Sequence, residues 1–263
     1  MQTVTSADGT TIAYERSGQG PPLIVVGGAM NDRTAAAPLA ELLSTTFTVV
    51  AYDRRGRGDS GDTQPYAPER ELDDLATLLE ALGGSASVFG HSSGAVLALD
   101  AAAHGLAITR LALYEPPFTV DDSRPPVPED FVATLEQLTA LGRRGDAVAY
   151  FMTTGVGLPP QMVAQGRNEP MWPALERLAH TLSYDGRIMG DTMRGHPLPT
   201  DRWSTVTIPV LVLDGGASPE WQRTATRSLA ALLPSAEHRT LEGQTHRADP
   251  EVLVPVLSAF FAL

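Results

Sequence analysis

The sequence contains no cysteine and no lysine, and each absence excludes a class of function. Without cysteine, the chain can form neither disulfide bonds nor thiolate metal sites. All 19 basic residues are arginines, and 31 acidic residues outnumber them, which gives a formal net charge of −12. Nucleic acids and anionic membrane surfaces attract basic patches. The charge balance therefore predicts no nucleic-acid partner and no membrane partner.

Long apolar runs are also missing. No run approaches the 18 residues of a membrane span, and residues 1–17 lack the basic-then-apolar pattern of a secretory signal. We therefore expect a cytoplasmic protein. No His/Asp cluster has metal-ligand spacing and no glycine-rich phosphate loop is present, so we expect no metal and no cofactor. The 263 residues suffice for one large core, or for a core with an insertion.

The most informative stretch is GHSSG at residues 90–94, which lies between an apolar run and a helical pattern. Glycines two positions either side of a serine, between a strand and a helix, are typical of a nucleophile elbow. The sharp turn forces the serine into an unfavourable backbone region, and glycines without Cβ leave room for it. We predict Ser92 as the nucleophile, with the Ser93 N–H facing developing negative charge. The alternative is a glycine-rich turn that only packs a helix onto a sheet.

Strand and helix patterns alternate along most of the chain. Such alternation predicts a mainly parallel sheet with helices on both faces. Strands are expected at residues 3–6, 11–14, 23–26, 47–53, 87–89, 110–115, 208–214 and 238–241, and helices at 35–44, 69–82, 219–233 and 250–261.

Residues 118–207 differ from the rest of the chain. A stretch rich in proline and charge is followed by helical patterns at 131–141, 146–154, 160–165 and 172–182, without an obvious strand. We interpret 118–207 as a helical cap over the carboxyl ends of the strands. The core then consists of residues 1–117 and 208–263.

Four features, in one order along the chain, resemble the α/β-hydrolase superfamily. Residues 23–29 resemble its oxyanion strand and turn, DRRGRGDS at 53–60 resembles its D-x-R-G-x-G-x-S loop, 90–94 resembles its elbow, and GQTH at 243–246 resembles its histidine loop. The resemblance implies an α/β-hydrolase fold with a mainly parallel eight-stranded sheet and a helical cap. It also implies a monomer or homodimer. The charged residues of 53–60 are interpreted mostly as a structural loop, with substrate binding as the alternative.

The resemblance implies that His246 is the base that takes the proton of Ser92. The family's usual acid position holds Ser218, which carries no charge. Two carboxylates at strand ends are substitutes, Glu115 and Asp214. Glu115 is preferred for its longer reach, and because a subset of haloalkane dehalogenases take their acid from that place. Asp214 and the absence of any acid stay open as alternatives.

The remaining site residues surround this triad. The resemblance implies an oxyanion hole made by the backbone N–H groups of Ala29 and Ser93. Methionine and aromatic residues of the cap predict an adaptable apolar lining. The residues expected to bind the substrate are Gly28, Met30, Phe118 and Trp172.

These residues predict a serine hydrolase that cleaves a mostly apolar carboxylic ester, thioester or lactone of small or medium size. One alternative is acyl transfer to hydrogen peroxide, because YDRRG at 52–56 also resembles cofactor-free haloperoxidases (perhydrolases). Another is a non-catalytic ligand-binding module that has kept the fold, which Ser218 favours. The partner in each case is a small molecule.

Overall fold

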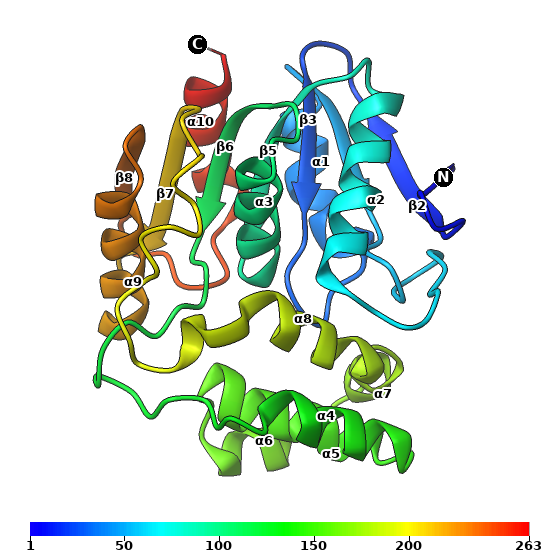
Figure 1. Ribbon diagram of the computed structural model, residues 1–263, viewed down its shortest axis with the longest axis vertical. Coiled ribbons are helices and arrows are strands. Elements are labelled where there is room, and N and C mark those ends of the chain that lie inside the picture. Colours follow the sequence, from blue (N-terminus) through cyan, green and yellow to red (C-terminus); the bar gives the residue numbers. More distant parts are fainter. Residues whose placement is uncertain (263) are drawn as a thin grey trace.

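An eight-stranded sheet forms the centre of the protein in a computed structural model that describes residues 1–262 (Figure 1). The strand order is β1-β2-β4-β3-β5-β6-β7-β8. β1 and β2 form an antiparallel hairpin, β2 runs antiparallel to β4, and the other neighbours are parallel, which confirms the predicted fold. The strands are β1 (Gln2–Thr5), β2 (Thr11–Ser17), β3 (Pro22–Val26), β4 (Thr48–Tyr52), β5 (Ala86–His91), β6 (Ile108–Tyr114), β7 (Val210–Gly215) and β8 (Ala236–Leu241).

Helices cover both faces of the sheet, because the central strands are apolar on both sides. Ile24 and Val26 point into the core on one face, and Leu23 and Val25 into the core on the other. The first face is covered by α2 (Pro68–Ala81), α3 (Ser93–Ala103) and α9 (Glu220–Leu232). The second is covered by α1 (Ala37–Leu43), which follows a 3₁₀ turn (Arg33–Ala36), and by α10 (Pro250–Phe261).

Residues between β6 and β7 form a separate helical layer, which we call the insertion (residues 118–207). It contains α4 (Phe131–Ala140), α5 (Arg144–Tyr150), α6 (Pro160–Gly166), α7 (Trp172–Arg177) and α8 (Leu182–Met189), with a π-helical turn (Phe151–Val156) and two 3₁₀ turns (Ala179–Thr181 and Gly190–Met193). Figure 1 shows this layer at the end of the sheet toward which the parallel strands run. The division into a core and a cap domain at residues 118 and 207 stays a prediction.

One expected helix differs from the structure. The pattern at 172–182 is divided into α7, a 3₁₀ turn and α8, which runs on to Met189. α8 ends where Gly190 adopts a φ of 55°, a conformation that glycine reaches at little cost. The extension matters because it brings Asp185 into the helical layer's inner face, where it is fully buried.

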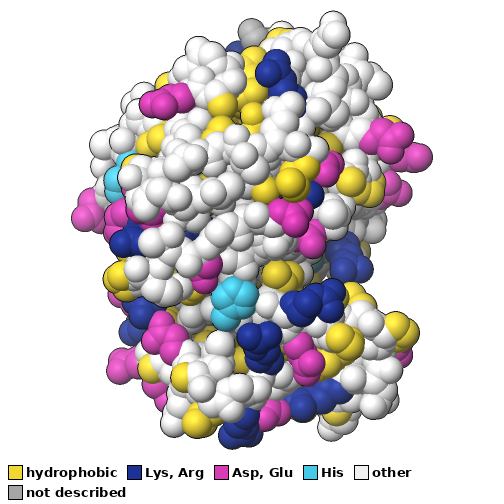
Figure 2. Space-filling view, turned by 90° about the vertical axis from the view of Figure 1, so that its right-hand side faces the viewer, with side chains coloured by type: hydrophobic (Ala, Val, Ile, Leu, Met, Phe, Trp, Pro, Cys, Tyr) yellow, Lys and Arg dark blue, Asp and Glu magenta, His cyan; other side chains and the backbone are white. Residues whose placement is uncertain are grey.

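Side chains of both charges are present on the surface, as the composition of the sequence predicts. Figure 2 shows acidic and basic side chains interspersed over one face, with hydrophobic side chains scattered among them. None of the helices described over residues 1–262 has the length and apolar character needed to cross a membrane.

Candidate active site

The turn between β5 and α3 has the backbone geometry of an elbow. Ser92 has φ 56° and ψ −126°, a region that costs a residue with a side chain about 1–3 kcal/mol. A Cβ on Gly90 would lie 2.6 Å from the Cα of Ala95, so only glycine fits there. Ser93 is the first residue of α3, and its N–H therefore has no acceptor within the helix.

The loop after β3 passes directly beside this serine. A Cβ added to Gly28 would lie 2.9 Å from the Cβ and 3.5 Å from the Oγ of Ser92. Ala29 follows, and Met30, which is partly buried, has a φ of 58°. Gly28 and the predicted oxyanion donor Ala29 therefore belong to the backbone that borders Ser92.

His246 and Glu115 meet at the carboxyl ends of the strands. Nδ1 of His246 lies 2.7 Å from Oε2 of Glu115, whose side chain is fully buried. The other carboxylate oxygen, Oε1, accepts the N–H of Gly215 at 2.8 Å. The ring of His246 lies 4.7 Å from that of His91, the residue before Ser92, which brings the histidine loop to the elbow.

Asp214, the alternative acid, is turned away from His246. Its Oδ2 lies 2.8 Å from Nε2 of His238 and accepts the hydroxyl of Thr226 at 2.8 Å. Of the two carboxylates that the sequence leaves open, the structure brings only Glu115 to His246. In this structure Asp214 is paired with His238 and Thr226, and its contacts do not include His246.

Gln222 was missed by the sequence analysis. Its side chain is 4% exposed, and its Nε2 lies 2.8 Å from Nδ1 of His246. Nδ1 can donate a hydrogen to the Glu115 carboxylate or accept one from Gln222 Nε2, but it cannot do both at once. The ionised carboxylate is the stronger partner, and an amide turned by 180° would offer its oxygen instead. No motif marks Gln222, which lies in the first turn of α9.

Two of the residues expected to bind substrate are packed inside the protein. Phe118 is fully buried, with its ring 5.4 Å from that of Trp203. Trp172 is 5% exposed, and its indole N–H donates to Glu176 at 3.0 Å. In this conformation neither offers exposed surface for a substrate, so both contribute to packing.

A cavity of about 400 Å³ lies on the α1 and α10 side of the sheet, behind the histidine loop. It is lined by His91, His246, Phe89, Leu39 and Leu253, among others. Burial and, to a smaller extent, the neighbouring His246 lower the pKa of His91 to about 3. His91 is therefore neutral at pH 7, and its ring faces the cavity on this side of the sheet.

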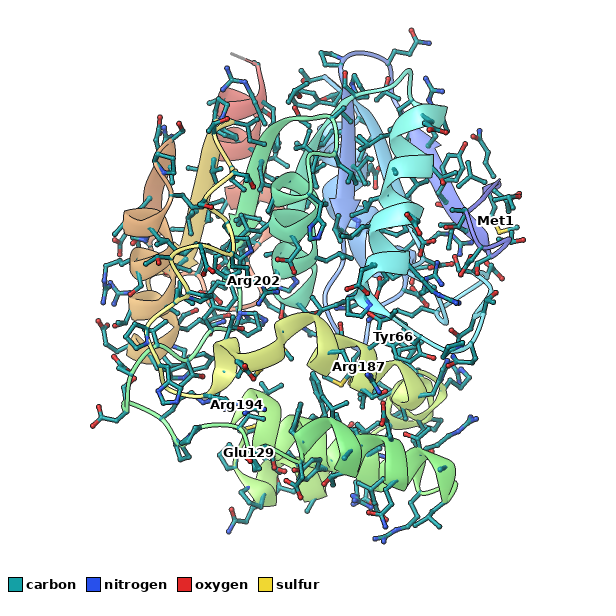
Figure 3. The ribbon with its side chains drawn as sticks, viewed as in Figure 1. Met1, Tyr66, Glu129, Arg187, Arg194 and Arg202 are labelled. Carbon is teal, nitrogen blue, oxygen red and sulfur yellow. The ribbon has the colours of Figure 1, made fainter. Side chains whose placement is uncertain are left out.

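The 53–60 loop carries buried arginines, and their partners come from other elements. Arg54 forms two hydrogen bonds with Glu71 of α2, at 2.7 and 2.8 Å, and Arg55 forms two with Asp74, at 2.8 and 2.7 Å. Tyr66 donates to Glu71 at 2.8 Å, and Figure 3 shows Tyr66 at the level where the core meets the insertion. The loop is thus structural, as interpreted, but its ion pairs reach far beyond the turn itself.

Within residues 1–262, no group of three or more acidic or histidine side chains is arranged to hold a metal ion. The candidate site therefore consists of a serine, a histidine and a carboxylate at one edge of the sheet, with backbone N–H groups beside the serine. Such an arrangement can support nucleophilic attack on a carbonyl group with proton transfer through the histidine.

Residues 7–256 match the model of the "Alpha/beta hydrolase family". An alpha/beta hydrolase from Sphaerobacter thermophilus DSM 20745 has a crystal structure with TM-score 0.93 and 59% identity, over 99% of this chain and 100% of that one. The 2-(acetamidomethylene)succinate hydrolase of Mesorhizobium japonicum is 26% identical over 266 residues, 95% of this chain and 91% of that protein. The hydrolase YraK of Bacillus subtilis is 38% identical over 96 residues, so the match spans only 35% of its length.

Proposed function

This chain belongs to the alpha/beta hydrolase family, and on that premise we propose that it is a serine hydrolase acting through an acyl-enzyme on Ser92. Its substrate is a mostly apolar carboxylic ester, thioester or lactone. The observation that carries the proposal is the 2.7 Å contact between Nδ1 of His246 and the buried carboxylate of Glu115, on a loop whose His246 ring lies 4.7 Å from that of His91, the residue before Ser92. The insertion acts as the cap that shapes the substrate pocket.

The proposed reaction follows from these positions. Glu115 accepts the Nδ1 hydrogen of His246, which leaves Nε2 unprotonated and able to take the proton of Ser92. The serine Oγ bonds to the substrate carbonyl carbon, and the N–H groups of Ala29 and Ser93 stabilise the oxyanion. As the tetrahedral intermediate collapses, the bond to the leaving group breaks and His246 gives that group its proton. Water, deprotonated by His246, then releases the acid and restores the serine.

The geometry favours hydrolysis over the other two interpretations. The peroxide-dependent alternative depended on residues 52–56, but Arg54 and Arg55 are engaged in buried ion pairs, a structural reason for their presence. The binding-module alternative depended on Ser218, and Glu115 supplies the carboxylate that Ser218 lacks. A relative named as a hydrolase across 91% of its length also favours hydrolysis. The proposal includes a cytoplasmic monomer or homodimer that needs no cofactor.

Labelling with an alkyl fluorophosphonate, followed by intact mass measurement, tests the proposal. We expect one adduct on the wild-type protein and none on Ser92→Ala, because only a serine activated by a base attacks the phosphorus rapidly. Short-chain and medium-chain p-nitrophenyl esters should be hydrolysed by the wild type and not by Ser92→Ala. A folded wild type that neither takes the label nor hydrolyses any of these esters would refute the proposed function.

A further inference from the structure

One carboxylate of the insertion contacts Ser93 directly and reaches the other side of the predicted oxyanion hole through Arg57. Asp185 lies in α8 and is fully buried. Its Oδ1 accepts the hydroxyl of Ser93 at 2.7 Å and Nη1 of Arg54 at 2.8 Å. Nη2 of Arg57 donates to Oδ1 at 2.9 Å and to Oδ2 at 2.8 Å. Asp185 is thus joined to the residue after the nucleophile and to the arginine loop.

Arg57 connects Asp185 to the other proposed donor, the N–H of Ala29. Its Nη1 donates to the backbone carbonyl of Gly28 at 2.6 Å. That carbonyl and the N–H of Ala29 belong to one planar trans peptide, in which they point in opposite directions. A guanidinium that binds the Gly28 oxygen therefore fixes the direction in which the Ala29 N–H points. It also polarises the peptide, which strengthens that N–H as a donor.

Around Asp185, the positive charges of two arginines are matched by the negative charges of two carboxylates. Arg54 pairs with Glu71 and Asp185, while Arg57 pairs with Asp185, and all four side chains are at most 2% exposed. Burial alone would raise the pKa of Asp185, but Arg57 and Arg54 hold it below its usual value. The two arginines therefore favour the ionised form of Asp185. Its removal would leave a buried guanidinium without its carboxylate, free to turn away from the Gly28 carbonyl.

We propose that Asp185 is a positioning residue that couples the insertion to the oxyanion hole, through Arg57 to the Gly28–Ala29 peptide and through its direct contact to Ser93. This inference rests on the proposed function, since it assigns no role to Asp185 in the absence of an oxyanion. Both proposed donors are aligned only when α8 lies against the core. The insertion then contributes to catalysis as well as to the substrate pocket.

Asp185→Asn tests the coupling, because it keeps the size of the side chain and removes its charge. We expect kcat for p-nitrophenyl butyrate to fall about tenfold to a hundredfold, with KM changed less than about threefold, since an oxyanion-hole donor acts mainly in the transition state. Affinity for an alkyl trifluoromethyl ketone, which forms a tetrahedral oxyanion on the serine, should fall by a similar factor. Ser93→Ala removes one contact of Asp185 but keeps both N–H groups, and kcat should fall about twofold to tenfold.

Two matched controls separate positioning from general destabilisation. Asp74→Asn breaks the Arg55 ion pair, which is equally buried but does not touch the Gly27–Ala29 loop. Asp100→Asn weakens another contact between core and insertion, the ion pair of Asp100 with Arg202. Arg202 is labelled in Figure 3, and this ion pair lies away from Ser92. Both should lower the melting temperature and leave kcat and inhibitor affinity within about twofold of the wild type.

The outcomes distinguish this inference from the proposed function. A wild type without fluorophosphonate label or ester turnover refutes both. A labelled, active wild type whose Asp185→Asn variant behaves like Asp74→Asn refutes only the positioning role. A loss confined to KM, with unchanged affinity for the trifluoromethyl ketone, also refutes it. If Asp185→Asn does not fold, Ser93→Ala takes its place in this comparison. A Ser93→Ala variant with kcat and inhibitor affinity like those of Asp74→Asn then refutes the positioning role.

Discussion

Glu115 is fixed by two contacts, one from each oxygen of its buried carboxylate, to Gly215 and to His246. Glu115→Gln keeps the shape of the side chain but removes the charge that stabilises a protonated imidazole. We expect kcat for p-nitrophenyl butyrate to fall about 10²–10⁴-fold, with little change in KM. Asp214→Asn should stay within about threefold of the wild type, because Asp214 contacts His238 instead. Equal losses in the two variants would contradict this assignment.

Residue positions also show what a sequence pattern can and cannot predict. The elbow at 90–94 is a local pattern that was predicted from its spacing, and the histidine loop is a local pattern that was predicted from its resemblance to the family. The choice between Glu115 and Asp214 depends on how β6 and β7 pair and on which way each side chain points beyond its strand. Local spacing contains no information about that direction. Gln222 and Asp185 were missed for the same reason, because their partners lie 24 or more residues away along the chain.

The turn from β5 to α3 stores strain that a substitution can release. Ser92→Ala and Ser92→Gly both remove the hydroxyl, so the difference between them reports the backbone alone. Glycine adopts a φ of 56° without the penalty of about 1–3 kcal/mol. We expect Ser92→Gly to be more stable than Ser92→Ala by about 1 kcal/mol or more, a melting temperature higher by several degrees.

Ser87, in the same strand, is the matched control for this comparison. Ser87 pairs regularly with Leu23 of β3, beside a register shift in the pairing of β5 with β6, and its φ is not positive. Glycine therefore relieves no strain there, loses conformational entropy and contributes no side-chain contact. Ser87→Gly should therefore be less stable than Ser87→Ala. If glycine also destabilises position 92 relative to alanine, the turn is not strained and the elbow interpretation of its backbone is wrong.

At the scale of the whole molecule, the sheet was more predictable than the insertion. The central strands are mainly apolar runs bounded by turn residues, so their positions follow from composition, and the eight strands were all expected. The insertion has helical patterns only, and these leave open where one helix stops and how the layer meets the core. The helices α7 and α8 were therefore not separated, and the buried ion pairs of Asp185 were not anticipated.

His91, which lies beside His246, makes the stability of the whole protein depend on pH. Burial lowers the folded pKa of His91 to about 3, against about 6.5 in the unfolded chain. The unfolded state therefore binds more protons between these values, and the contribution of neutral His91 is complete above pH 6.5 and lost as the pH falls toward 3. Between pH 7.5 and 4.5 this contribution should decrease by about 2.5–3 kcal/mol. His91→Gln should flatten the decline of melting temperature over this range, whereas His104→Gln, at an exposed position, should not. Parallel declines in the wild type and His91→Gln would mean that His91 is protonated in the folded protein.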